Sequence, residues 1–101
     1  KTLKSFVESL EGHKDQNAVK NALDAWYQEA KAAKWKSSAD VKDRYAHASI
    51  INAERVVFNI KGNDYRLVVA INYKGEVVFI KWIGTHKAYD EIAAATVKHD
   101  V

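Results

Sequence analysis

The chain has 101 residues and a net charge of +3, and it contains no cysteine, proline or methionine. This length suits one domain, which we place at residues 1–101. The absence of cysteine excludes disulfides, thiolate metal sites and a cysteine nucleophile. No stretch approaches the roughly 18 apolar residues of a membrane span, and the first ten residues lack the apolar core of a signal peptide, so we expect a soluble cytoplasmic protein.

The first half of the sequence has the periodicity of helices. Apolar residues recur at helical spacing in residues 2–11 and 19–33, with Gly12 as the break between them. Asp15 or Asn17 can cap the second of these helices. Two amphipathic helices joined by a short turn predict a helical hairpin.

A brief third helix is predicted after the hairpin. Ser37 and Asp40 have the spacing of a capping box, which predicts a helix that runs to Ala46. The large aromatic residues before it are expected to pack in the core. They are Trp26, Tyr27 and Trp35.

The second half of the sequence changes to the two-residue period of strands. Val, Ile and aromatic residues are concentrated in residues 55–61, 64–72 and 77–83. Gly62-Asn63 and Lys74-Gly75 separate these segments, and each pair predicts a two-residue hairpin turn because its glycine accepts a positive φ. The sequence therefore predicts an α+β fold, in which the helical hairpin packs on one face of an antiparallel sheet of at least three strands, followed by a short C-terminal helix.

Two-residue turns would fix the register of this sheet. Arg66 would lie between Asn59 and Ile83, and Lys81 would lie beside Val68. Side chains alternate between the two faces, and one face is almost wholly apolar, so it is expected to pack on the helices. Its members are Val56, Phe58, Ile60, Tyr65, Leu67, Val69, Ile71, Tyr73, Val78, Ile80 and Trp82.

The opposite face, here called the second face, combines cations with apolar residues. Its members are Arg55, Val57, Asn59, Lys61, Asp64, Arg66, Val68, Ala70, Asn72, Val77, Phe79, Lys81 and Ile83. Cations with an interleaved aromatic residue such as Phe79 suit a phosphate backbone with a stacked base. A solvated face that serves only solubility is the alternative explanation of this pattern.

A histidine marks the end of the last predicted strand. Thr85 can cap a helix from His86 to about Thr96, and helical spacing then places Tyr89 and Asp90 on the same face as His86. His86 can act as a base near neutral pH, with Asp90 to orient it. A surface histidine followed by an acid that stabilises the helix is the alternative.

No metal site is predicted. His13, His47 and His99 are isolated in the sequence, and no pair of ligands has the spacing of an H-E-x-x-H motif.

Several segments form a family pattern over nearly the whole chain. They are Ala25-Trp26-Tyr27, Ala33-Lys34-Trp35, Ala39-Asp40-Val41-Lys42, F-N-I-K-G-N at 58–63, Y-R-L-V-V-A-I at 65–71 and G-T-H-K-A-Y-D at 84–90. In this order they resemble the HigB toxins of type II toxin–antitoxin modules, which are similar to the RelE mRNA interferases. The resemblance implies a short strand ahead of the first helix and a RelE-like fold.

The resemblance also implies an activity and its partners. Such toxins cleave mRNA, typically on the translating ribosome, and a helix-turn-helix antitoxin neutralises them. The implied reaction is attack of a ribose 2′-hydroxyl on the adjacent phosphate, without a metal or other cofactor. It needs a base, an acid and cations that stabilise the developing phosphorane charge.

For this reaction we assign roles on the second face and at the strand-to-helix junction. Arg66 and Lys81 are the predicted phosphate stabilisers, and His86 is the predicted base or acid. Tyr89 is predicted to stack on a base or share in proton transfer. Outer contacts to RNA are assigned to Arg55, Asn59, Lys61 and Phe79.

Two other functions would use the same features. A non-catalytic module that binds RNA or the ribosome needs the cations but no groups for proton transfer. A protein-interaction domain would place the second face against an acidic partner.

Overall fold

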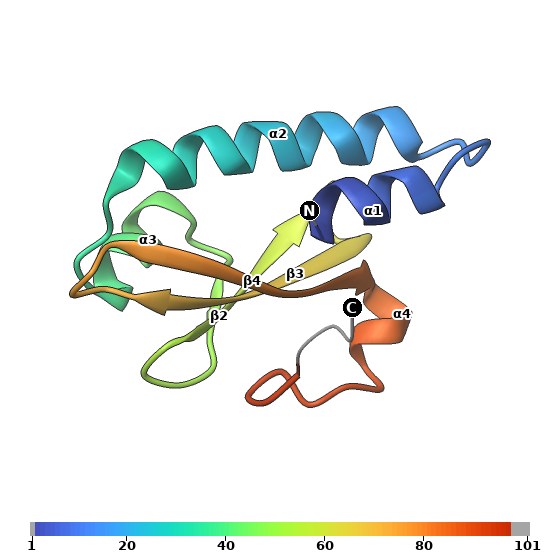
Figure 1. The fold of residues 1–101 in the computed structure, drawn as a ribbon. Helices are drawn as coiled ribbons and strands as arrows, with labels where there is room; N and C mark the ends of the chain where they lie inside the picture. Colours follow the sequence, from blue (N-terminus) through green and yellow to red (C-terminus); the bar gives the residue numbers. More distant parts are fainter. Residues whose placement is uncertain (1, 98–101) are drawn as a thin grey trace.

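The computed structural model describes residues 2–97, so His99 lies outside the described residues (Figure 1). Along the chain the elements are α1 (Thr2–Ser9), α2 (Gln16–Ala33), α3 (Ser38–Arg44), β1 (Ser49–Ile50), β2 (Arg55–Ile60), β3 (Tyr65–Asn72), β4 (Val77–Thr85) and α4 (His86–Tyr89). Among these described elements, no helix has the length and apolar character needed to cross a membrane.

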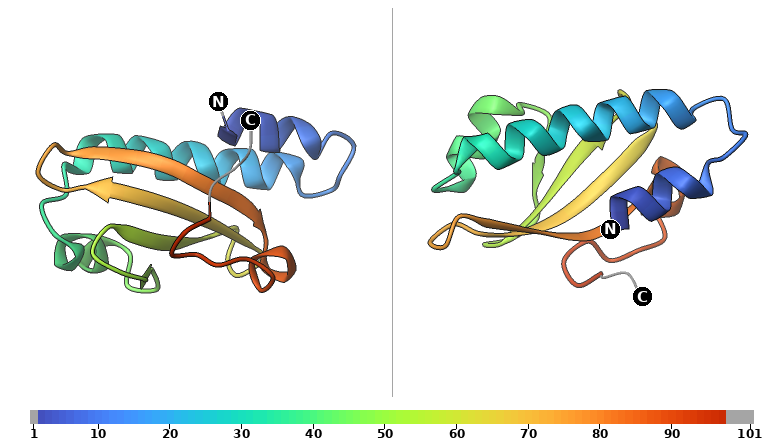
Figure 2. Two further views of the ribbon diagram at one scale, coloured as in Figure 1. Left: turned by 60° about the horizontal axis from the view of Figure 1, so that its bottom comes forward. Right: turned by 45° about the horizontal axis from the view of Figure 1, so that its top comes forward.

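The strands form one antiparallel sheet in the order β1-β2-β3-β4. Helices α1 and α2 lie on one side of this sheet, and the segment from α4 to Val97 lies on the other side (Figures 1 and 2). This arrangement confirms the predicted α+β fold. The sequence did not predict β1, which pairs through Ser49 and Ile50 with the outer edge of β2.

Helix α2 packs on the sheet through one narrow stripe. Val19, Leu23 and Trp26 are buried, and their spacing of four and three residues places them on one side of a helix. Tyr27, one residue further around the helix, is 50% exposed, so the prediction that it packs in the core is wrong. The adjacent residue in a helix points about 100° away, and this rotation carries Tyr27 off the packed stripe.

Phe58 on β2 is the centre of an aromatic cluster. Its ring centroid lies 5.4 Å from Trp26, 5.9 Å from Trp35 and 5.1 Å from Tyr45. These contacts join α2, the loop after it and the end of α3 to the middle of β2. Burial of one such large side chain contributes about 1.5–3 kcal/mol, so this cluster holds the helical layer on the sheet.

A β-bulge divides β4 into two halves. The predicted register holds between β2 and β3, where Asn59 faces Arg66, and between β3 and β4 as far as the Val69–Ile80 pair. Beyond that pair the register shifts, so that Val68 faces Trp82 and Lys81 is an extra residue in β4. The bulge reverses which face the following side chains point to.

The reversed half of β4 corrects two predictions. Trp82 lies on the second face with Val57 and Val68, whereas Ile83 is 2% exposed in the core on the helical side. Each was predicted on the other face, because a strict two-residue alternation had been assumed along the whole strand. Arg66 accordingly faces Gly84 and not Ile83.

The indole of Trp82 lies against the backbone of Gly84. A Cβ at Gly84 would come within 2.5 Å of the Trp82 ring, a distance that no side chain tolerates without movement. Glycine at this position therefore lets the ring lie close to its own strand.

The C-terminal segment, residues 86–97, covers part of the second face. Val57, Val68 and Trp82 are buried there, and partly buried apolar residues pack against them. Those from the C-terminal segment are Ala88, Tyr89, Ile92, Ala94 and Val97. The expectation of an open face along the whole sheet is therefore wrong for this part.

Helix α4 is consequently much shorter than predicted. It ends at Tyr89 instead of about Thr96, and the chain then turns back across the sheet. Burial of Ile92 and Val97 against the sheet outweighs the helical propensity of the alanine-rich sequence between them, because most helical stability in proteins comes from packing.

Arg55 holds this returning segment in place. The residue is 9% exposed, and its Nη1 atom donates hydrogen bonds to the carbonyl oxygens of Ala94 (3.3 Å) and Val97 (2.6 Å). Arg55 lies on the predicted face but was expected to project into solvent, and that expectation is wrong. Sequence position alone does not show that a segment some forty residues later covers it.

Both hairpin turns differ from the two-residue turns that were predicted. The last strand pairs are Ile60–Tyr65 and Asn72–Val77, which leaves longer connections. In the second connection Glu76, and not Gly75, has a positive φ of 57°. The Asn72 side chain accepts a hydrogen bond from the Gly75 N–H at 3.0 Å, so a side chain shapes this turn.

We predict that Gly84→Ala destabilises the fold by about 1–3 kcal/mol, since the added methyl group overlaps the Trp82 ring. Gly75→Ala is the matched control, because a Cβ there meets only the Asn72 side chain at 3.5 Å and φ is not positive. Urea denaturation followed by tryptophan fluorescence measures both. Equal stability of the two variants would contradict this placement of Trp82.

We also predict that Arg55→Met releases the C-terminal segment. Methionine has a similar length but cannot donate to the carbonyl groups of Ala94 and Val97, so amide hydrogen exchange in residues 90–97 should accelerate at least about five-fold. Lys20→Met is the control, since Lys20 is an exposed cation on α2 whose ion-pair partner is Asp24. Unchanged exchange in Arg55→Met would show that the guanidinium does not hold this segment.

Candidate nucleic-acid interface

One end of the second face remains open. At this end β2 finishes, β3 begins and β4 finishes, so that Asn59, Arg66 and Gly84 lie side by side across three strands. Asn59 is exposed and Arg66 is half-buried. His86 follows two residues after Gly84, so the fold brings three predicted site residues to this open end: Asn59, Arg66 and His86.

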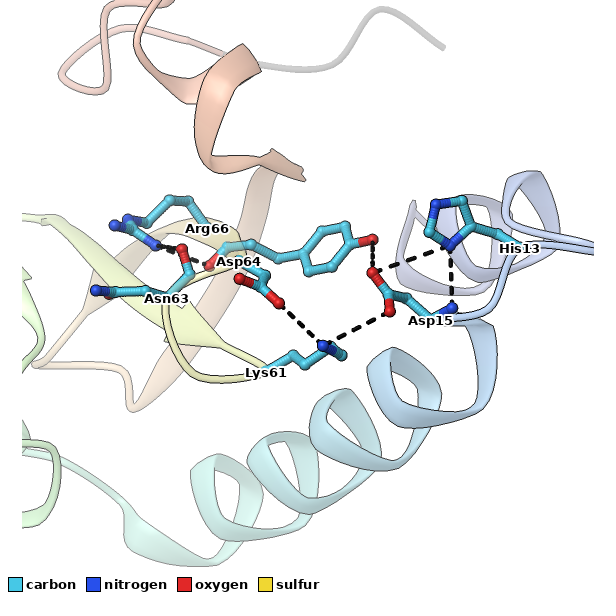
Figure 3. A network of polar contacts seen from close by, with 7 residues as sticks. His13, Asp15, Lys61, Asn63, Asp64 and Arg66 are labelled. Atoms are coloured by element: carbon cyan, nitrogen blue, oxygen red, sulfur yellow. Dashed lines mark hydrogen bonds and ion pairs between the residues drawn. The ribbon is translucent and has the colours of Figure 1, made fainter.

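Arg66 carries a charge that is not neutralised by an acid. Its Nη1 atom donates hydrogen bonds to the backbone carbonyl oxygens of Asn63 (2.8 Å) and Tyr65 (3.2 Å) (Figure 3). Within residues 2–97 no carboxylate forms an ion pair with it. The two carbonyl groups orient the guanidinium and leave its charge available to an anion.

The half-buried Lys81 and the exposed Phe79 form a second group, nearer the middle of β4. The Lys81 ammonium lies 5.6 Å from the centre of the Phe79 ring, and this ring is 50% exposed. Lys81 has no ion pair among the described residues. Gly84 is three positions further along β4, which corresponds to about 10 Å at the rise of a strand. The fold therefore does not bring Lys81 into the immediate row of Asn59 and Arg66.

Lys61 departs from its predicted position. It lies in the turn between β2 and β3 with a φ of 52°, so it does not continue the alternation of β2. Its ammonium forms ion pairs with Asp64 (2.9 Å) and Asp15 (3.6 Å) (Figure 3). The hydrogen bond to Asp64, together with the charge of Asp15, raises the pKa of Lys61. The positive charge of Lys61 is therefore paired with carboxylates of the protein itself.

Asp15 connects the helical hairpin to the sheet. It precedes α2, but its side chain makes no capping hydrogen bond, which corrects the prediction that it caps this helix. Its carboxylate instead accepts a hydrogen bond from the Tyr65 hydroxyl at 3.1 Å and lies near Lys61 and His13 (Figure 3). Desolvation opposes ionisation, but the Tyr65 hydroxyl and the Lys61 charge outweigh it and hold the pKa of Asp15 below its usual value.

His86 and Tyr89 have different surroundings, since His86 is exposed and Tyr89 is partly buried. The His86 Nδ1 atom lies 3.7 Å from an Asp90 carboxylate oxygen, and both side chains are more than half exposed. Tyr89 is partly buried and packs on Trp82 with 6.3 Å between ring centroids. The Thr85 hydroxyl caps α4 as predicted, by accepting a hydrogen bond from the Ala88 N–H at 3.1 Å.

A groove of about 560 Å³ adjoins the open end. It lies between the segment that links α3 to β1 and the turn that links β2 to β3. The polar residues that line it are Arg44, Tyr45, His47, Asn59 and Asn63.

Sequence reasoning missed His47 and Asn63. His47 was taken as isolated, but it lies two residues before Ser49, which pairs with Val57, and therefore comes near Asn59. Recognition of β1 as a strand would have placed His47 beside the end of β2. Two residues are too short a strand for periodicity to reveal it.

Of the residues that line the groove, Tyr45 is uncharged and its neighbour Arg44 is a cation. Burial, together with the neighbouring Glu29 carboxylate, raises the pKa of Tyr45 to about 12, so its phenol stays protonated at physiological pH. Arg44 forms an ion pair with Glu29, and its guanidinium lies 5.5 Å from the centre of the Tyr45 ring. No acidic residue is among the described residues that line this groove.

The described chain offers no obvious metal site. Within residues 2–97 there is no group of three or more His, Cys, Asp or Glu side chains placed to hold a metal ion.

Comparison with known families gives a match that covers the described sheet and its open end. The family model described as HigB toxin, a RelE-like toxic component of a toxin–antitoxin system, matches residues 19–92. These residues include α2 from Val19 onward, α3, the four described strands and α4. A search of curated protein sequences finds no match.

We predict that Asp15→Asn lowers the free energy of unfolding at neutral pH. The difference in this free energy between the variant and the wild type should narrow as the pH falls below about 4. The pKa of Asp15 is lowered in the folded state, so the unfolded state binds more protons there and the stabilisation is lost on acidification. Urea midpoints between pH 2 and pH 7 test this. Asp24→Asn is the control because Asp24 pairs with Lys20 on the exposed side of α2. A difference that does not vary with pH would contradict the role of the carboxylate charge.

Proposed function

Because the chain belongs to the HigB family of RelE-like toxins of toxin–antitoxin systems, we propose that it is a ribonuclease that cleaves mRNA and thereby stops translation. We place its substrate at the open end of the second face. The proposal includes a cytoplasmic site of action, since its substrate is mRNA, and an antitoxin of the helix-turn-helix class as its protein partner.

The observation that carries this proposal is how the four cations predicted on the second face are used. Lys61 is paired with carboxylates, and Arg55 is buried under the C-terminal segment. Arg66 and Lys81 have no such partner within residues 2–97, and both were assigned to phosphate from the sequence. Unpaired cations on an exposed surface are favourable sites for a polyanion.

The proposed reaction begins with attack of a ribose 2′-oxygen on the neighbouring phosphorus. The bond from phosphorus to the 5′-oxygen breaks, which yields a 2′,3′-cyclic phosphate and a free 5′-hydroxyl. A base removes the 2′-hydroxyl proton, and an acid protonates the departing 5′-oxygen. His86 is our candidate for one of these two transfers, with Asp90 as the group that orients its ring.

Arg66 stabilises the charge that develops on the phosphate oxygens. Its guanidinium is held by two carbonyl groups, so little reorganisation is needed when the charge appears. Lys81 is about 10 Å further along β4, a distance that suits a neighbouring phosphate of the same strand better than the one that reacts. Phe79 is then placed to stack on a base near Lys81.

Tyr89 has a positioning role in this scheme. Its ring packs on Trp82, and it belongs to the single turn of α4 that also carries His86. We propose that this contact fixes the direction of α4 and hence the place of His86. The ribosome would supply the remaining alignment of mRNA, because among the described residues of the open end we assign only His86 to proton transfer.

We predict that Arg66→Ala and His86→Ala each lower mRNA cleavage about 100-fold, and that Lys81→Ala lowers it less. Primer extension on mRNA from cells that express each variant measures cleavage, and relief of growth arrest measures toxicity. Lys87→Ala is the control for His86, since it changes the adjacent exposed residue of α4.

The same experiment separates cleavage from simple binding. Full toxicity and unchanged new 5′ ends in a folded Arg66→Ala, Lys81→Ala, His86→Ala triple variant would overturn this site. Growth arrest by the wild type without any new 5′ ends would indicate a module that binds RNA or the ribosome without cutting. Circular dichroism of each variant shows whether the fold is retained.

A further inference from the structure

The groove beside the open end has the properties of a binding site for a small planar ligand. Its volume of about 560 Å³ lies within the range of about 300–1,000 Å³ that is typical of small-ligand sites. Tyr45 is the partly exposed aromatic residue in its lining, and Asn59 and Asn63 supply carboxamides. A carboxamide both donates and accepts hydrogen bonds, which suits the edge of a nucleobase.

The polar groups around the groove are available to a ligand. Among the described residues, the side chains of His47, Asn59 and Asn63 make no hydrogen bond or ion pair with another protein group. By contrast, the polar side chains of the neighbouring hairpin network, such as Lys61 and Asp64, bind one another. These three side chains are exposed, so their donors and acceptors bind water in the free protein, and a ligand can take the place of that water.

The groove is continuous with the phosphate site proposed above. Asn63 lines the groove, and its backbone carbonyl accepts the hydrogen bond from Arg66 at 2.8 Å. Asn59 also lines the groove and is the direct cross-strand neighbour of Arg66. A nucleotide whose phosphate contacts Arg66 can therefore place its base in the groove without leaving the protein surface.

We propose that this groove holds the base of one RNA nucleotide next to the cleaved phosphate and thereby sets the base preference of cleavage. Asn59 and Asn63 contact the edge of the base, and His47 closes the side of the groove formed by the segment before β1. This inference rests on the proposed ribonuclease function for its biological meaning. Its physical content, a nucleotide site at these residues, does not depend on cleavage.

A peptide from the antitoxin is a weaker candidate for the same groove. The hollow is bounded by one loop and one turn, whereas docked peptides use an open strand edge or a long apolar groove. Arg44 adds no free charge to the groove, because its guanidinium is paired with Glu29. The carboxamides of Asn59 and Asn63, beside Arg66, are the groups that favour a nucleotide.

Sequencing of 5′ ends from a pool of cleaved transcripts tests the proposal. Wild-type protein should prefer one base at a fixed position beside the cut, and Asn59→Ala and Asn63→Ala should each reduce that preference at least about five-fold. Arg66→Ala should lower cleavage at all sites and keep the relative preference. Asn21→Ala, which removes an exposed amide on α2, is the matched control and should change neither the amount of cleavage nor the base preference.

Calorimetric titration with nucleoside 3′-monophosphates at millimolar concentration gives a readout that does not require cleavage. Binding by the wild type that is lost in Asn63→Ala supports the groove, even if the protein proves not to cut RNA. Unchanged base preference in both variants, together with no nucleotide binding, overturns the groove proposal and leaves the ribonuclease proposal standing. Loss of antitoxin binding in these variants without any nucleotide binding also overturns it, by assigning the groove to the antitoxin.

Discussion

The extra residue in β4 determines how the second face of the sheet is used. Lys81 interrupts the pairing with β3, and the side chains that follow it change faces. Trp82 therefore joins Val57 and Val68 on the second face and creates an apolar surface there. The C-terminal segment covers that surface, and the part of the face beyond it stays open. Without the bulge, Lys81 would lie beside Val68 on the second face, and Ile83, not Trp82, would point toward the covering segment.

The cations of the protein consequently serve different purposes that their sequence pattern does not distinguish. Arg55 is a structural group that donates to backbone carbonyl oxygens of the covering segment. Lys61 joins two carboxylates and helps to connect the helical hairpin to the sheet. Arg66 is oriented by carbonyl groups and has no acidic partner among the described residues, and Lys81 also lacks one. A small net charge is thus compatible with individual cations that have no acidic partner among the described residues.

Much of the fold could be predicted from the sequence, because local signals such as strand alternation and capping residues agree with the way the elements pack. The alternation in β2 and β3 correctly placed Arg66 beside Asn59, and the capping box correctly placed the start of α3. The bulge could not be predicted, because the run from Val77 to Ile83 has large apolar residues at both odd and even positions. Either register would bury apolar side chains, and only contacts with distant segments decide between them.

The candidate site was harder to predict than the fold for a related reason. Burial of Arg55 depends on a segment about forty residues away, and His47 reaches the groove through a two-residue strand. Both are tertiary effects that no local pattern records. The residues that could be placed from the sequence alone were those on regular, unbroken parts of the sheet, Asn59 and Arg66 among them.

The central claim is that RNA binds at the open end of the second face. The most direct measurement is a titration of isotopically labelled protein with a short RNA that carries a 2′-deoxy nucleotide at the cleavage position, which prevents the attack. We expect the largest changes in amide chemical shift at Asn59, Arg66 and His86, weakening as salt is added. Changes centred instead on the lysine-rich end of α2 near Lys31 and Lys34, or no changes at the open end, would contradict the account.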